Sequence, residues 1–264
     1  MLVAITLGNK NEKFADQLLE AEKNQVGIKP QTTVDPELTV EEAYHIQLKN
    51  IATKIEHGNK VVGKKIGLTS KAMQNLLGVN EPDYGHLLSN MVVENGGAVP
   101  KEGILQPKVE AEIAFILKED LKGPNVTALD VIKATDYVLP AIEIVDSRIV
   151  NWKIQLADTI ADNASSAFYV LGGKPAKIEE VNLELIGMVL SKNGEIVNTG
   201  VGAAALGNPI LCVSWLANRL ADFDISLRAG EIILSGALSA AVDAHEGDSF
   251  IARFAHLGEV SVRF

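Results

Sequence analysis

The sequence contains a single cysteine, Cys212, among 264 residues, and it has no long uncharged hydrophobic run. One thiol can form neither an internal disulfide nor a cysteine-based zinc site, which favours a reducing cytoplasm as the protein's location. No apolar run approaches the roughly 20 residues that a membrane helix needs. The first ten residues, MLVAITLGNK, have a short apolar stretch with no preceding basic residue, which is not the pattern of a secretory signal.

Basic residues are outnumbered, because 24 Lys and Arg stand against 34 Asp and Glu and give a formal net charge of −10. An acidic surface repels nucleic acid and anionic membranes, so neither is expected as a main partner. Apolar residues make up 47% and charged residues 22%, the composition of an ordinary globular protein. A chain of this length buries enough surface to fold without a disulfide or zinc site.

The first 60 residues predict a small helical region. Thr39 and Glu42 have the spacing of a capping box, in which each residue satisfies the other's backbone N–H at a helix start. An apolar stripe at spacings of three and four follows and stops near Gly58: Tyr44, Leu48, Ile51 and Ile55. We expect an earlier helix around residues 14–26.

Residues 61–264 predict one β-rich catalytic unit. Alternating apolar patterns predict strands at 61–68, 108–117, 138–145, 186–190, 231–235, 249–254 and 259–264. Asn193-Gly194 predicts a type I′ hairpin turn. Helices and strands do not alternate regularly, which argues against a Rossmann sheet or a TIM barrel.

Four local features add detail to this region. Thr69 is expected to cap a short helix that ends near residue 77, and residues 81–85 have the composition of a turn. Asn208-Pro209 predicts a helix start. The expected buried face of that helix consists of Leu211, Val213, Trp215, Leu216 and Leu220.

Two carboxylates on one predicted strand are the most informative feature. Side chains alternate along a strand, so Glu110 and Glu112 share one face of 108–117 while the residues between them are apolar. An isolated Glu-x-Glu is more often a solvated face. A third acid, Glu143, interrupts another apolar strand, and charged residues are rarely buried unless paired. One shared hard cation, Mg²⁺ or Mn²⁺, explains the three acids most economically.

A second cluster contains Lys64, Lys65 and Asp83. Lys65 lies in an apolar strand and is either a functional ammonium or a surface lysine whose stem is buried. Asp83 alone would be read as a turn former. We expect Asp146 and Arg148, after the Glu143 strand, to form a structural ion pair.

Several segments together resemble the fumarylacetoacetate hydrolase superfamily, in particular its hydratase/decarboxylase branch from aromatic meta-cleavage pathways. The resemblance covers nearly the whole chain after residue 40. It rests on KKIGLTSKAMQNLLGV (64–79), EPDYG (81–85), QPKVEAEIAF (106–115), GPNVTALDVIKATDYVLPAIEIVDSR (123–148), ADNASS (161–166), GVGAAALGNP (200–209) and EIILSGAL (231–238).

The resemblance implies an α+β fold, a mixed β-roll with peripheral helices, and a homo-oligomer that can associate with a neighbouring enzyme of its pathway. It implies that Glu110, Glu112 and Glu143 bind Mg²⁺ or Mn²⁺. Lys65 and Asp83 are implied as catalytic residues. Ser235 and Gly236 are implied to approach a small 2-oxo or 2-enol acid substrate.

The activity implied is metal-dependent addition of water to a short 2-hydroxydienoic acid. Decarboxylation of a six-carbon 2-oxo diacid is the alternative, and a non-catalytic binding subunit is a third possibility that the intact site residues oppose. Asp83 favours the hydratase, because water addition needs a group that can deprotonate water. Whether Lys65 or Asp83 activates the water stays open at this point.

Overall fold

The computed structural model describes residues 8–264, apart from the side chains of residues 76 and 77, so the first seven residues of the N-terminal segment lie outside it. The helices are α1 (Asn9–Asn24), α2 (Gln31–Val34), α3 (Val40–Glu56), α4 (Lys71–Leu77), α5 (Ala128–Ala134), α6 (Leu156–Ala161) and α7 (Pro209–Leu220). The strands are β1 (Val61–Gly67), β2 (Asp83–Leu88), β3 (Val92–Val93), β4 (Lys108–Leu117), β5 (Thr135–Val145), β6 (Ser166–Leu171), β7 (Gly187–Lys192), β8 (Glu195–Val201), β9 (Ile232–Leu234), β10 (Val242–Asp243), β11 (Ser249–Phe254) and β12 (Gly258–Arg263).

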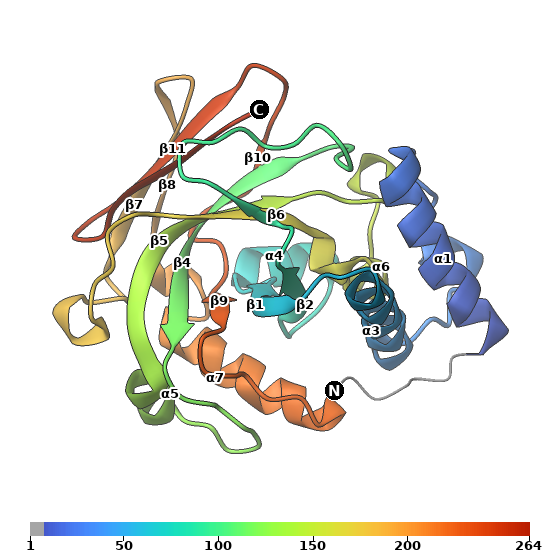
Figure 1. Cartoon of the computed structure of the whole chain (residues 1–264), viewed down its shortest axis with the longest axis horizontal. Coiled ribbons are helices and arrows are strands. Elements are labelled where there is room, and N and C mark those ends of the chain that lie inside the picture. The colour runs from blue at the N-terminus through green and yellow to red at the C-terminus, as the bar shows by residue number, and fades with distance from the viewer. Residues whose placement is uncertain (1–7) are drawn as a thin grey trace.

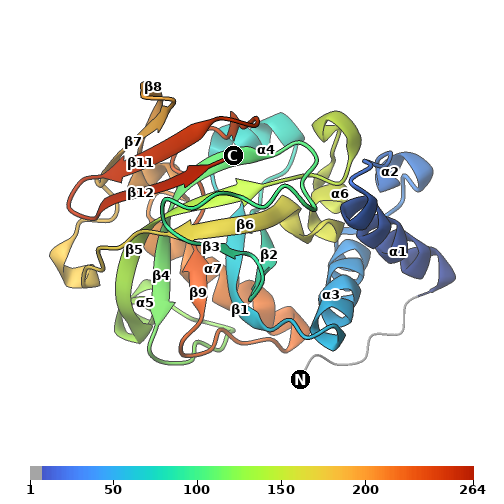
Figure 2. The ribbon, with the colours of Figure 1, turned by 45° about the horizontal axis from the view of Figure 1, so that its top comes forward.

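Two sheets form the centre of the molecule. Over the described residues, the larger sheet has eight strands in the order β2-β1-β9-β4-β5-β6-β3, with β10 paired to β4, and the smaller has four in the order β12-β11-β7-β8. The larger sheet is mixed, since β1 pairs parallel with β9 and antiparallel with β2. It is strongly curled, the small sheet lies against one end of it, and helices lie at its periphery (Figures 1 and 2). The predicted α+β β-roll is confirmed.

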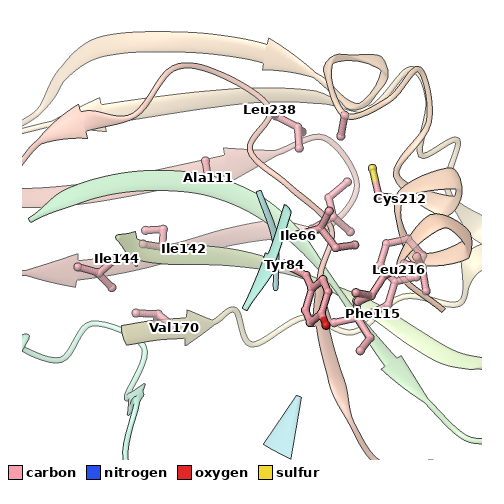
Figure 3. Packing of buried hydrophobic residues seen from close by; sticks show 14 of the residues in the cluster. Ile66, Tyr84, Ala111, Phe115, Ile142, Ile144, Val170, Cys212, Leu216 and Leu238 are labelled. Carbon is pink, nitrogen blue, oxygen red and sulfur yellow. The ribbon is translucent and has the colours of Figure 1, made fainter. Parts of the chain in front are cut away.

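The apolar face of β4 builds the core. Val109, Ala111, Ile113 and Phe115 alternate along the strand, and all are completely buried. They belong to one cluster with Ile142 and Ile144 of β5 and with Cys212 and Leu216 of α7. Figure 3 shows Ala111 and Phe115 among these neighbours. Because successive side chains on a strand point to opposite faces, this packing forces Glu110 and Glu112 to the other face.

The N-terminal helices form as the sequence predicts. The capping box of Thr39 and Glu42 is present at the start of α3. Helix α3 packs on α6 and carries Gln47, whose side-chain amide donates to the carbonyls of Tyr84 (3.0 Å) and Ile160 (2.8 Å). Within residues 8–264, no helix combines the length and the apolar character that a membrane crossing requires. The boundary at residue 60 stays a prediction, although β1 begins at Val61.

Two expectations around the first hairpin were wrong. The cap of α4 is Ser70, whose hydroxyl accepts from the Met73 N–H at 3.2 Å, and not Thr69. The expected turn at 81–85 is shorter, because β2 starts at Asp83 and pairs antiparallel with β1. Sheet pairing outweighs the turn propensity of the Asp and Gly at positions 83 and 85.

Two further expectations also need correction. Leu211 is 45% exposed, because the buried face of α7 instead follows Cys212, Val213, Leu216 and Leu220. The partner of Arg148 is Asp162, at 2.5 Å, and not Asp146. The Asp146 carboxylate accepts from the backbone N–H groups of Leu105 (2.9 Å) and Gln106 (2.7 Å).

The buried pair of Arg148 and Asp162 yields a stability prediction. Both side chains are at most 5% exposed, so Arg148→Met would leave the carboxyl of Asp162 buried without its cation. We expect the free energy of unfolding to fall by about 3–5 kcal/mol. Urea denaturation measures it, with Arg253→Met as the control, because Arg253 pairs with Glu259 on the exposed surface. Equal losses in the two variants would contradict the prediction.

Candidate metal centre and active site

Three carboxylates meet on the inner face of the large sheet. Glu110 of β4 lies directly across from Glu143 of β5 in the antiparallel register, and Glu112 is one alternation further along β4. One oxygen from each of the three carboxylates lies within 4.8 Å of the other two. The structure therefore brings together the three acids that the sequence singled out.

The oxygens of this triad are incompletely satisfied by protein donors. One oxygen of Glu112 accepts from the Gly236 N–H at 2.8 Å, and one oxygen of Glu143 accepts from the Ser166 hydroxyl at 2.8 Å. The second oxygen of Glu112 is buried and has no hydrogen-bond partner, and the second oxygen of Glu143 is buried and contacts only the Lys65 ammonium, at 3.3 Å. Buried polar atoms are nearly always hydrogen-bonded. Three converging carboxylates, two of them with an oxygen that accepts no hydrogen bond, fit a divalent cation such as Mg²⁺ or Mn²⁺.

The electrostatics also favour a cation. Burial raises the pKa of Glu110 to about 7; Lys65 opposes this and Glu143 adds to it. Burial, Glu143 and Glu110 together raise the pKa of Glu112 well above its usual value. Carboxyls this close cannot all ionise unless positive charge is supplied. Lys65 and Lys108 are the ammonium groups that act on Glu110, and Lys108 is itself paired with Asp243, so their charge does not balance three carboxylates.

Lys65 and Asp83 come from the paired strands β1 and β2. The Lys65 ammonium lies 3.3 Å from Glu143 and donates to the carbonyl of Ala164 at 3.0 Å. Burial by itself would lower the pKa of Lys65, but Glu143 and Asp83 outweigh it and raise that pKa. Lys64 points to the other face of β1, where it pairs with Glu231 at 2.8 Å. The alternation of β1 thus separates the two lysines.

The Asp83 carboxyl is almost completely buried. Burial raises its pKa to about 6, against the opposing effect of Lys65, and one of its oxygens has no hydrogen-bond partner. A carboxyl with a pKa close to neutral exchanges protons readily near physiological pH.

A cavity of about 540 Å³ opens onto part of this site, and Glu112 and Glu143 are not among its lining residues. Lys65, Asp83 and Glu110 contribute to its wall, together with the hydroxyl-bearing residues Thr159 and Ser165. The remaining lining is mostly apolar and includes Ile66, Leu68, Met73, Val145, Trp152 and Ile154. A mainly apolar cavity with a few converging polar groups is the usual form of a small-molecule site.

Ser235 and Gly236 are not among the residues that line this cavity. The Ser235 hydroxyl donates to the carbonyl of Ile113 at 2.9 Å, and the Gly236 N–H donates to Glu112. Gly236 has φ +103°, and an added Cβ would lie 2.3 Å from the Thr69 hydroxyl oxygen. These two residues fix β9 against β4 and orient a carboxylate of the triad.

The loop after α6 supplies contacts that the sequence did not predict. Asn163, Ala164 and Ser165 all have φ near +50°, a left-handed conformation that residues other than glycine rarely adopt. This turn presents the Ala164 carbonyl to Lys65, and the next residue, Ser166, donates to Glu143. The ADNASS segment signals the family, but the role of a backbone carbonyl leaves no signature in side-chain identity.

Comparison with protein families gives a match over residues 64–264 to the model described as fumarylacetoacetate (FAA) hydrolase C-terminal. Among relatives, a 2-hydroxypent-2,4-dienoate hydratase from Pseudomonas putida is 48% identical over 81% of this chain and 97% of its own length. A 2-hydroxyhexa-2,4-dienoate hydratase from Comamonas testosteroni is 45% identical over 96% of this chain and 97% of its own length.

Among solved structures, the chain resembles a 4-oxalocrotonate decarboxylase from Pseudomonas putida G7, complexed with magnesium and adipate. The TM-score is 0.95 at 42% sequence identity, and the match covers 98% of this chain and 99% of that chain.

The position of Gly236 generates a prediction about metal affinity. A methyl group in Gly236→Ala collides with Thr69 and moves the N–H that holds Glu112. Changes to groups that orient metal ligands typically weaken metal binding by about 10–100-fold. We expect the affinity of Gly236→Ala for Mg²⁺ or Mn²⁺, measured by titration calorimetry, to be lower than that of the wild type by about 10–100-fold.

Gly247→Ala is the matched control, because Gly247 has a similar φ of +91° with nothing within 4 Å of an added Cβ. Glu110→Gln should lose binding altogether, as a neutral amide is a poor ligand for a hard cation. Unchanged affinity in Gly236→Ala would show that this N–H does not orient a metal ligand.

Proposed function

The chain belongs to the fumarylacetoacetate hydrolase family, and we propose that it is a metal-dependent hydratase of that family. Its substrate is 2-hydroxypenta-2,4-dienoate, and its product is 4-hydroxy-2-oxopentanoate. The observation that carries this proposal is the buried Asp83 carboxyl, which lines the same cavity as Glu110 and Lys65. The similarity to two dienoate hydratases over most of the chain supports the same reaction class.

The metal site of this proposal consists of Glu110, Glu112 and Glu143. A Mg²⁺ or Mn²⁺ ion there would supply Lewis-acid stabilisation of negative charge on the 2-oxo oxygen of the substrate. The relative complexed with magnesium supports this choice of ion. Gly236 and Ser166 hold the carboxylates in place, so the ligand set needs little rearrangement to bind the ion.

Lys65 and Asp83 have different roles in this reaction. The raised pKa of Lys65 keeps it an ammonium at neutral pH, so it donates hydrogen bonds and does not accept a proton. Asp83 ionises near pH 6 and is therefore the group that takes a proton from the attacking water. The dienol first becomes the α,β-unsaturated ketone, as the 2-hydroxyl loses its proton and C5 gains one. The oxygen of water then bonds to C4 as Asp83 takes a proton from that water, and protonated Asp83 returns this proton to C3.

A decarboxylase of the six-carbon 2-oxo diacid is the second candidate, because the solved decarboxylase structure matches almost the whole chain. The same ligand triad would serve loss of carbon dioxide, which needs no group to activate water. An ionised Asp83 would also repel a departing carboxylate. Asp83 therefore favours the hydratase.

The further context of the protein is proposed on similar grounds. We expect a cytoplasmic homo-oligomer that can associate with a neighbouring enzyme of its pathway. Strand β8 exposes three apolar side chains, Ile196 at 68% and Val197 and Val201 at 39% each, and such an exposed apolar strand supports a contact between subunits.

Turnover of two substrates tests the proposed function. The five-carbon dienol acid should lose its ultraviolet absorbance as water adds, and EDTA should abolish the reaction while Mg²⁺ restores it. Carbon dioxide release from the six-carbon diacid, measured in parallel, should be slower. Faster release of carbon dioxide than hydration would establish the decarboxylase instead, and no turnover of either acid would reject both.

The role of Asp83 gives a second prediction. In Asp83→Asn, hydration should fall by about 10²–10⁴-fold, because the general base is lost while the shape of the side chain is kept. Metal content should be unchanged. In the wild type, kcat/KM should decline as the pH falls below about 6, because protonation removes the base. Wild-type hydration rates in Asp83→Asn would rule out this role.

A further inference from the structure

Lys108 lies on the same face of β4 as Glu110 and Glu112, the two triad carboxylates of that strand. Residues two apart on a strand are separated by about 7 Å and point the same way, so Glu112, Glu110 and Lys108 form a row. Lys108 lines the same cavity as Glu110, and its side chain is 25% exposed. The row therefore leads from the buried metal site to the cavity mouth.

The ammonium group of Lys108 already has an anionic partner. Strand β10 pairs antiparallel with the start of β4, as Figure 1 shows, and places Asp243 opposite Lys108. The Lys108 ammonium forms an ion pair with the Asp243 carboxylate. Lys192 lies nearby, but it donates to the backbone carbonyl of Asp243 at 2.8 Å and pairs with Asp248. The pair at the mouth thus has no net charge.

An aromatic ring fixes the position of this pair. The Lys108 ammonium lies 5.3 Å from the centroid of the Trp152 ring, within the range of a cation–π contact. The indole N–H of Trp152 donates to the carbonyl of Gln106 at 3.0 Å, which holds the ring in place. Val145, Ile154 and Ala240 contribute apolar side chains to the same cavity.

A substrate that binds the triad through its carboxylate and 2-oxo group would extend its tail along this row. An uncharged tail meets Trp152 and the aliphatic wall. A second carboxylate meets an ammonium that Asp243, which is not itself among the cavity-lining residues, already neutralises.

We propose that the Lys108–Asp243 pair on Trp152 determines specificity for the distal end of the substrate, admitting an uncharged tail and discriminating against a second carboxylate. This inference rests on the proposed function, since it assumes a 2-oxo acid bound at the triad. Asp243 is the residue that sets this preference, because its ion pair with Lys108 leaves no free ammonium group for a second substrate carboxylate.

Binding of two unreactive acids tests the proposal. 2-Oxohexanoate and 2-oxoadipate share the chelating end and lack the reactive double bond, and they differ in the charge of the tail. With Mg²⁺ present, calorimetry should give the wild type a lower Kd for 2-oxohexanoate. In Asp243→Asn, the Kd of 2-oxoadipate should fall about fivefold relative to that of 2-oxohexanoate, the upper range for an exposed ion pair.

Two further variants make the assignment specific. Adding Lys108→Met to Asp243→Asn should cancel the gain in affinity for 2-oxoadipate, because the Lys108 ammonium, freed from Asp243, is the group that binds the second carboxylate. Asp136→Asn is the matched control, since it removes one charge from another exposed pair, with Lys177, that is not among the cavity-lining residues. It should leave the ratio of the two Kd values unchanged.

The outcomes separate the two proposals. If 2-oxohexanoate binds but Asp243→Asn moves the ratio no more than Asp136→Asn does, the specificity inference is overturned and the proposed function stands. If neither acid binds the wild type in the presence of Mg²⁺, the 2-oxo acid site itself is wrong, and the inference fails with it.

Discussion

The antiparallel register of β4 and β5 is the constraint on which the site depends. It sets Glu110 opposite Glu143 and brings Glu112 into the same group, in surroundings where carboxylates are costly to ionise together. The apolar alternation of β4 enforces this register, because a slip of one residue would turn Ile113 and Phe115 out of the core. The strand register that buries the hydrophobic face of β4 therefore also brings the three carboxylates together on the opposite face.

Much of the surrounding structure holds this concentrated charge in place. Gly236 and Ser166 each bind one oxygen of a carboxylate, and Lys65 supplies a single positive charge. The left-handed turn at 163–165 is energetically unfavourable by itself. The buried pair of Arg148 and Asp162 secures its start, since Arg148 also donates to the Asp162 carbonyl at 2.6 Å. An ion pair outside the cavity thus stabilises the strained conformation of the loop at 163–165.

Sequence patterns predicted the elements that packing and local hydrogen bonds specify together. The capping box at Thr39, the strand 108–117 and the Asn193-Gly194 turn, with positive φ at both residues, occur as expected. Errors arose where two local signals competed. Asp83 has turn chemistry but joins a strand, because pairing with β1 gives its backbone better hydrogen bonds. Arg148 has an acid two residues away but pairs with Asp162, since the carboxylate of Asp146 is taken by backbone donors.

The sequence by itself singled out Glu110, Glu112, Glu143 and Lys65, because charged residues are out of place in apolar strands. Asp83 stood in a predicted turn, and only the family resemblance pointed to it. Alternation along a strand is a local property, so it could also place Glu110 and Glu112 on one face. Only the tertiary structure decided that the Gly236 N–H binds Glu112, that the Ser235 hydroxyl binds the carbonyl of Ile113, and that neither residue is among those lining the cavity. Only the tertiary structure could show that Lys65 donates to the backbone carbonyl of Ala164 and that Lys108 forms an ion pair with Asp243. These contacts join segments far apart in the chain, and their geometry depends on strand register and loop conformation, which no local pattern specifies.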